Sequence, residues 1–296
     1  MRNEPVQTLT ISCAHDLAYV PQYIGMARGF FAERGIAVTL RHGVGTVEDT
    51  VGAIDRGEAD LLLGSCVYGV RLAETGMEPV LVAQSNQQTR HMLARRTEDS
   101  RDLSWADLRG KSIVIYPGEA PTAWAAFTYG LATAGLSLAD IKPIFGFSAR
   151  DAIAEFVRGV GDLLFIDGEA TLRDDLFPAL PVCGQTGRLP WSVYMASRRT
   201  VARKEPLLRQ FADGLAASQE WLRSAETPEI AETVAPYFPQ YAPERLREIV
   251  AFYRSLDLWA ADSRLQMDAL QRWSEALRLG GLLSPDRQLT DYLDVL

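Results

Sequence analysis

Apolar and polar residues along the chain follow two alternating patterns, a short apolar run and a longer stretch with helical spacing. The first example is Leu9–Phe31, in which Leu9–Cys13 has the near-alternation typical of a strand. Ala14–Asp16 is a polar cluster, and apolar residues then recur at helical spacing as far as Phe31. In an α/β sheet, ligands bind at the loops that follow the carboxyl ends of strands. The stretch therefore predicts a strand, a candidate ligand-binding loop and a helix.

The same strand, loop and helix layout recurs along the chain. Further strands are predicted over 36–40, 60–64, 79–83, 91–95, 112–116, 141–145, 162–166 and 191–196. Helices are predicted over 47–56, 65–76, 123–134, 149–157, 206–224, 228–236, 243–256 and 264–279. Asp60–Gly64 is almost continuously apolar after its first residue, as in parallel strands that are buried on both faces. The pattern predicts an α/β fold with a helical C-terminal tail.

Two segments have closely similar sequences. Gly57–Leu63 and Gly159–Phe165 each combine a glycine turn, an aspartate and an apolar strand, and each follows a predicted helix of similar length. Two explanations are open: any connection from a helix to a buried strand has this form, or the chain contains two similar α/β lobes.

Composition narrows the classes of partner. The formal net charge is -8 and the pI about 5.1, which argues against nucleic acid and anionic membrane surfaces, because both need a basic face. No apolar run reaches the roughly 18 residues of a membrane helix, so no membrane insertion is expected. Three scattered cysteines and three histidines predict neither a disulfide framework nor a metal site, and no cofactor is expected.

The N-terminal segment bears on localisation. MRNEPVQTLT has no apolar region and no small-residue cleavage site of a secretory signal. The protein is therefore expected in the cytoplasm if the sequence is native as written, and in the periplasm or at the cell surface if a signal was removed.

Several short motifs together carry a family resemblance. They are Gly29-Phe30-Phe31 with Gly35-Ile36, Gly57–Asp60, Asp107–Lys111, Ala261-Asp262 and Gly280–Pro285. Their order and spacing over nearly the whole chain resemble the ABC-transporter solute-binding proteins of the nitrate, sulfonate, taurine and thiamine-pyrimidine type. The resemblance implies a type II periplasmic-binding-protein fold, with two α/β lobes joined by two crossover strands near Asn86–Arg95 and Leu189–Ala196.

The resemblance also implies how the lobes and the ligand are organised. Lobe 1 would comprise residues 1–90 and 193–296, and lobe 2 residues 91–192. A small molecule would bind in the cleft between the lobes of a monomer, for delivery to the permease of an ABC transporter. A minority of proteins on this fold are enzymes, including pyrimidine synthases of thiamine biosynthesis and an aromatic sulfinate desulfinase. An enzyme or a ligand sensor on the same fold is therefore the alternative function.

The candidate ligand-binding residues follow the predicted strands. They are His15, Asp16, Tyr19, Gly45, Thr46, Ser65, Cys66, Ser85, Asn86, Gly118, Glu119, Thr122, Asp167, Glu169, Trp191 and Tyr194. Four of these residues are carboxylates, and Arg188 is the one cation that the sequence lets us place near them. A dianionic ligand needs donors of opposite charge or helix N-termini. We therefore expect a neutral or cationic ligand of pyrimidine, amine or aromatic character, held by Tyr19, Trp191 or Trp124.

Each candidate also has a structural explanation. Asp16 can cap the first helix, Asp167 and Glu169 can solvate or cap a loop, and His15 can be an ordinary loop residue. Trp124 has helical spacing with Phe127 and Leu131, which favours core packing. Cys13 and Cys66 are best explained as small buried apolar residues. An enzyme would need one of these thiols beside His15, an arrangement that no spacing rule supports, and no catalytic residue is assigned.

Overall fold

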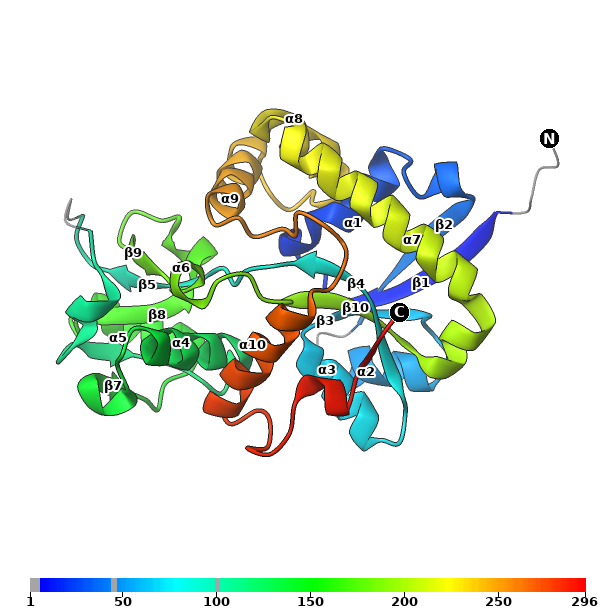
Figure 1. Cartoon of the computed structure of the whole chain (residues 1–296). Helices are drawn as coiled ribbons and strands as arrows, with labels where there is room; N and C mark the ends of the chain where they lie inside the picture. The colour runs from blue at the N-terminus through cyan, green and yellow to red at the C-terminus, as the bar shows by residue number, and fades with distance from the viewer. Residues whose placement is uncertain (1–5, 44–46, 99–101) are drawn as a thin grey trace. The chain divides into compact units, whose positions relative to one another are not determined.

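The computed structural model describes residues 6–43, 47–98 and 102–296. The chain forms two compact units (Figure 1). Unit 1 comprises residues 1–87, 190–271 and 288–296, and unit 2 comprises residues 88–189 and 272–287. The chain leaves unit 1 after Gln87 and returns at Pro190, within the two predicted crossover segments. Residues 272–287 belong to unit 2, whereas the sequence-based division placed all of 193–296 in lobe 1.

Unit 1 contains a six-stranded sheet in the order β11-β4-β10-β3-β1-β2. Its strands are β1 (Gln7–Cys13), β2 (Ile36–His42), β3 (Leu61–Gly64), β4 (Pro79–Asn86), β10 (Ser192–Ser197) and β11 (Asp294–Val295). β1 is parallel to β2 and β3, whereas β10 is antiparallel to both β3 and β4. The carboxyl ends of β1, β2, β3 and β4 therefore share one edge with the amino end of β10.

Most helices of unit 1 were predicted from the sequence. They are α1 (Val20–Ala27), α2 (Val47–Asp55), α3 (Cys66–Glu74), α7 (Arg198–Ser224), α8 (Thr227–Val234) and α9 (Pro243–Ser255). The sequence predicted that α7 would begin at Pro206, but the helix begins earlier and has non-helical backbone angles at Lys204. A proline disfavours helical geometry in the chain just before it, which accounts for a kink at this point. The segment 198–203 is thus an extra helical turn joined to the predicted helix.

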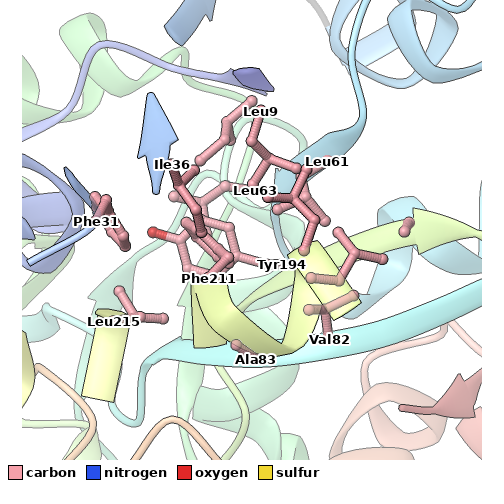
Figure 2. Packing of buried hydrophobic residues seen from close by; sticks show 14 of the residues in the cluster. Leu9, Phe31, Ile36, Leu61, Leu63, Val82, Ala83, Tyr194, Phe211 and Leu215 are labelled. Atoms are coloured by element: carbon pink, nitrogen blue, oxygen red, sulfur yellow. The ribbon is translucent and has the colours of Figure 1, made fainter. Parts of the chain in front are cut away.

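The core of unit 1 lies between the sheet and α7. Leu9, Leu61, Leu63 and Tyr194 from the strands pack with α7 residues such as Phe211 (Figure 2). The ring of Phe211 stacks on Phe31 at 5.1 Å between centroids and meets the edge of Tyr194 at 4.9 Å. The apolar side chains that predicted β1 and β3 are therefore buried by the amphipathic face of α7.

Unit 2 contains a five-stranded sheet in the order β7-β6-β8-β5-β9. Its strands are β5 (His91–Arg95), β6 (Ser112–Val114), β7 (Lys142–Ile144), β8 (Leu163–Asp167) and β9 (Phe177–Pro181). Its helices are α4 (Pro121–Thr133), α5 (Ala149–Val157) and α6 (Cys183–Thr186), and α10 (Met267–Leu279) crosses the boundary between the units. β9 and α6 were not predicted, because Phe177–Pro181 contains two prolines and no apolar alternation long enough to identify a strand.

The two similar segments identified in the sequence occupy equivalent positions. β3 and β8 each pair in parallel with one neighbour and antiparallel with the other. Asp60 accepts a hydrogen bond from the backbone N–H of Thr10 at 3.1 Å, and Asp162 accepts one from the N–H of Ser112 at 2.8 Å. In both units the aspartate thus ties its own strand to the parallel neighbour, which favours the interpretation that the lobes are similar.

No helix in residues 6–43, 47–98 and 102–296 is both long enough and apolar enough to cross a membrane.

Candidate ligand-binding site

Strand register gathers most of the unit 1 candidates at one edge of its sheet. Cys13 pairs with His42 where β1 and β2 end, so the loop carrying His15 and Asp16 begins there. Ser192 pairs with Asn86 and the next residue of β10 pairs with Gly64, which brings Ser65, Asn86 and Trp191 to the same edge. Gly45 and Thr46 lie outside the described residues.

The loop after β1 is fixed by two side-chain interactions. Asp16 Oδ1 accepts the N–H of Ala18 at 2.8 Å and so caps a short 3-10 helix over Leu17–Tyr19, as the structural explanation predicted. His15 stacks on Phe238 with 4.7 Å between ring centroids and only 5° between planes, and Tyr19 beside it is partly exposed. The loop thus places a carboxylate at this edge.

The two thiols proposed as nucleophiles are buried. Burial raises the pKa of the Cys13 thiol to about 11 and that of the Cys66 thiol to about 12. The Cys66 thiol donates to the carbonyl oxygen of Pro190 at 3.6 Å, and Cys13 Sγ lies 3.9 Å from Nδ1 of His42, a histidine that the sequence prediction did not consider. Both thiols are therefore protonated at neutral pH.

The polar residues at the end of β4 lie at the same edge of the sheet. The sequence ended this strand at Ala83, but it continues through Asn86, and both Ser85 and Asn86 are buried. Ala260, in the segment after α9, donates its N–H to the carbonyl oxygen of Ser85 at 2.9 Å, and the N–H of Trp191 donates to that of Asn86 at 3.0 Å. Tyr194 is fully buried and its hydroxyl donates to Gln22 at 3.3 Å. Trp191, in contrast, is partly exposed at the edge.

Three residues of unit 1 were missed by sequence reasoning. His42 is the last residue of β2, and Tyr237 and Phe238 follow α8 in the sequence. His15 Nε2 lies 2.8 Å from the carbonyl oxygen of Tyr237, which is 222 positions away along the chain. The position of His42 at a strand end was a signal that could have been used, whereas nothing local places Phe238 against His15.

In unit 2 the corresponding edge is built around Asp167. His91, the first residue of β5, pairs in register with Asp167, the last residue of β8. Arg90 Nε donates to Asp167 Oδ2 at 2.6 Å. Burial is the largest single influence and opposes the charge of this carboxylate. The charge and hydrogen bond of Arg90, together with His91 and the N–H of Glu169, outweigh burial and hold the pKa of Asp167 below its usual value. Burial also lowers the pKa of His91 to about 4, so its ring is neutral at pH 7.

The remaining unit 2 candidates lie on loops at the same edge. Gly118 and Glu119 are exposed, and Glu119 Oε1 accepts the N–H of Ala149 at the start of α5 at 3.2 Å. Thr122 lies in the first turn of α4, whose capping residue offers no side-chain acceptor. Asp167 Oδ1 caps the turn that carries Glu169 by accepting its N–H at 3.1 Å. Among the described residues, no group of three or more His, Cys, Asp or Glu side chains is placed to hold a metal ion.

The ion pair of Arg90 and Asp167 yields a pH-dependent prediction. Because the folded pKa of Asp167 lies below its unfolded value, the pair stabilises the fold above about pH 4 and loses this effect as pH falls through the folded pKa. Both side chains are partly exposed, so we expect a coupling energy of about 1 kcal/mol at pH 7. A double-mutant cycle of Arg90→Leu and Asp167→Asn by urea unfolding measures it. Coupling that persists unchanged at pH 2 would contradict the prediction.

Comparison with known proteins decides the family. A family model described as "ABC transporter, phosphonate, periplasmic substrate-binding protein" matches residues 32–232. This match covers more than half of the chain. The chain belongs to this family of ABC-transporter substrate-binding proteins. The resemblance identified from the motifs is thereby confirmed at the level of substrate-binding proteins of ABC transporters.

Relatives of this substrate-binding protein agree with that assignment. It is 21% identical over 257 residues to the putative binding protein YtlA of Bacillus subtilis (strain 168), covering 85% of this chain and 76% of the relative. The sulphonate-binding protein SsuA from Escherichia coli matches with a TM-score of 0.70 at 16% identity, covering 97% of each chain. SsuA from Xanthomonas axonopodis pv. citri, solved bound to MOPS, matches with a TM-score of 0.67 at 18% identity, covering 99% of each chain.

These structural likenesses bear on the fold. They confirm the periplasmic-binding-protein fold predicted for this substrate-binding protein, with two sheets and helices at the C-terminal end. At identities below 20%, the ligand of a neighbour is a property of that neighbour. Membership of the family implies a small-molecule ligand and an ABC transporter as partner, and the family description places its members in the periplasm.

Proposed function

We propose that this substrate-binding protein captures a small neutral or cationic organic molecule with aromatic or amine character. The observation that carries the proposal is the excess of negative charge among the candidate residues. Asp16, Glu119 and Glu169 bring carboxylates to the two sheet edges, whereas the charge of Asp167 is balanced by Arg90. None of the candidate residues is a lysine or an arginine, so they offer an anionic ligand no cation to offset the cost of desolvating it beside these carboxylates.

Aromatic side chains support the same ligand class. Tyr19 and Trp191 are partly exposed at the edge of the unit 1 sheet, where the faces of their rings can contact a planar or cationic group. Trp124 in unit 2 packs against Phe127 at 6.0 Å and Phe145 at 5.8 Å, and it is also partly exposed. We propose Tyr19 and Trp191 as the ring contacts, with Trp124 mainly a packing residue.

A thermal-shift panel tests the ligand class. The probes are 4-aminopyrimidine, benzylamine, ethanesulfonate and methylphosphonate, each measured against buffer. A ligand that binds only the folded state stabilises it by about 2.7 kcal/mol at about 100 times its Kd, which raises the melting temperature. We expect a rise with the first two probes and none with the anions. A rise with ethanesulfonate or methylphosphonate alone would refute the proposed ligand class.

The chain offers a matched control for the charge argument. Asp16→Asn keeps an oxygen that can cap the turn at Ala18 but removes the carboxylate charge. The variant is expected to keep the melting temperature of the unliganded protein and to reduce the rise produced by benzylamine. An equal rise in both proteins would show that Asp16 does not contribute to binding.

Delivery and location follow from the family and are part of the proposal. We propose that the liganded protein is a monomer that docks on the permease of an ABC transporter in the periplasm or at the cell surface. The enzyme alternative has weaker support, because the two thiols considered as nucleophiles, Cys13 and Cys66, are protonated at neutral pH. A ligand sensor would use the same binding residues with a different protein partner.

A further inference from the structure

Two histidines of unit 1 form a pair at the carboxyl ends of β1 and β2. The rings of His15 and His42 lie 4.8 Å apart between centroids, with 53° between their planes. His42 was not among the candidate residues, although both side chains are substantially exposed. An imidazole nitrogen either donates or accepts a hydrogen bond when the ring is neutral, so the chemistry of the pair depends on its tautomers.

The contacts of His42 favour one tautomer. Nδ1 lies 3.4 Å from the carbonyl oxygen of Cys13, which can only accept, and 3.9 Å from the Cys13 sulfur, a weak donor. The shorter contact, to the stronger partner, favours the tautomer with the proton on Nδ1. The buried part of the ring lowers the pKa of His42 and outweighs the hydrogen bond to the Cys13 carbonyl, which raises it, and His15 lowers it further. The ring is therefore neutral at pH 7. The other nitrogen, Nε2, therefore has a lone pair, and the described residues give it no hydrogen-bond donor.

The same reasoning applies to His15. Its Nε2 lies 2.8 Å from the carbonyl oxygen of Tyr237 and must donate to it. In the neutral ring, Nδ1 is then an acceptor as well. Stacking on Phe238 holds the plane of the ring in place. The pair thus offers two acceptor nitrogens from rings whose orientations are set by backbone contacts.

Within the part of the chain that the structure describes, the charged and titratable groups around the pair add no donor cation. Asp16 follows His15 on the same loop, and the protonated Cys13 thiol lies 3.9 Å from Nδ1 of His42. The ring of Tyr23 contacts the rings of both His15 and Tyr237. Arg41 precedes His42 on β2, but both its terminal nitrogens donate to Asp49 at 3.0 Å. The surroundings consequently favour a ligand group that donates hydrogen bonds.

We propose that His42 determines specificity, with its Nε2 accepting a hydrogen bond from an N–H group of the ligand and His15 Nδ1 available as a second acceptor. This inference rests on the proposed function and deepens it, because it names the ligand class as molecules with an amino or amidine-like N–H group. A ligand of the same size without that N–H leaves the acceptors unpaired and binds more weakly.

A matched ligand pair tests the inference. 4-Aminopyrimidine and 4-methylpyrimidine have similar size, but only the first has an exocyclic N–H. Calorimetric titration at pH 7 should give a Kd at least tenfold lower for 4-aminopyrimidine in the wild type. His42→Leu should remove this difference, and His42→Gln, which can present an oxygen near the position of Nε2, should restore part of it. Thr39→Leu, an exposed position on the same strand, is the control and should bind as the wild type.

A second measurement does not depend on any ligand. Correlation of the imidazole nitrogens with the ring protons by NMR identifies the tautomer of His42, which should carry its proton on Nδ1. The opposite tautomer would overturn the inference, as would selectivity that His42→Leu leaves intact. Binding of methylphosphonate with no binding of either pyrimidine would instead refute the proposed function and the inference with it.

Discussion

Replacing Phe211 with alanine is expected to lower the free energy of unfolding of unit 1 by about 3–5 kcal/mol. Phe211 is fully buried on α7 and joins two parts of the core, because its ring stacks on Phe31 and meets the edge of Tyr194. The substitution removes both ring contacts and leaves a cavity between α7 and the sheet. Urea unfolding followed by circular dichroism measures the loss.

The neighbouring residue provides the control for this substitution. Gln210 precedes Phe211 on α7 and is exposed, so Gln210→Ala should change the free energy of unfolding by no more than about 0.5 kcal/mol. If both variants lose the same small amount, α7 does not cover the sheet of unit 1 as described.

The second large effect is expected at Gly280, directly after α10. A Cβ added there would lie 2.4 Å from Cβ and 2.6 Å from Cα of Ala125 in α4. Because one of these atoms is backbone, the clash can be relieved only if the backbone at Gly280 moves relative to α4. Gly280→Ala should therefore destabilise unit 2 by about 1–3 kcal/mol in urea unfolding.

Gly184 is a matched control for this close approach. A Cβ at Gly184 meets no atom within 4 Å, and its backbone does not require a positive φ. Gly184→Ala should leave the stability nearly unchanged. Equal effects at the two glycines would contradict the close approach of Gly280 to Ala125 of α4.

The fold could be predicted from the sequence because its strands and helices carry local signals. The apolar run of β3 and the amphipathic spacing of α7 indicated whether each element is a strand or a helix and roughly where it lies in the sequence. The repeated glycine and aspartate before β3 and β8 even indicated the internal similarity, since Asp60 and Asp162 make the same contact to the neighbouring strand. β9 was missed because its register with β5, rather than its own composition, makes it a strand.

The candidate site was less accessible from the sequence because its contacts join distant segments. The sequence placed Asp167 on a loop after a strand, but Arg90, its partner, lies 77 positions earlier. Phe238 reaches His15 only because the segment after α8 returns to the sheet edge. The end of β4 was also predicted too early, since Ser85 and Asn86 continue the strand and their carbonyl oxygens accept hydrogen bonds from Ala260 and Trp191.

The claim on which the account depends is that the sheet edges of this substrate-binding protein select a neutral or cationic donor-bearing molecule. The most direct test is mass spectrometry of the small molecule that co-purifies with the protein and is released by denaturation. The account predicts a molecule with an amino or amidine-like group and no net negative charge. A co-purified sulfonate or phosphonate would contradict it.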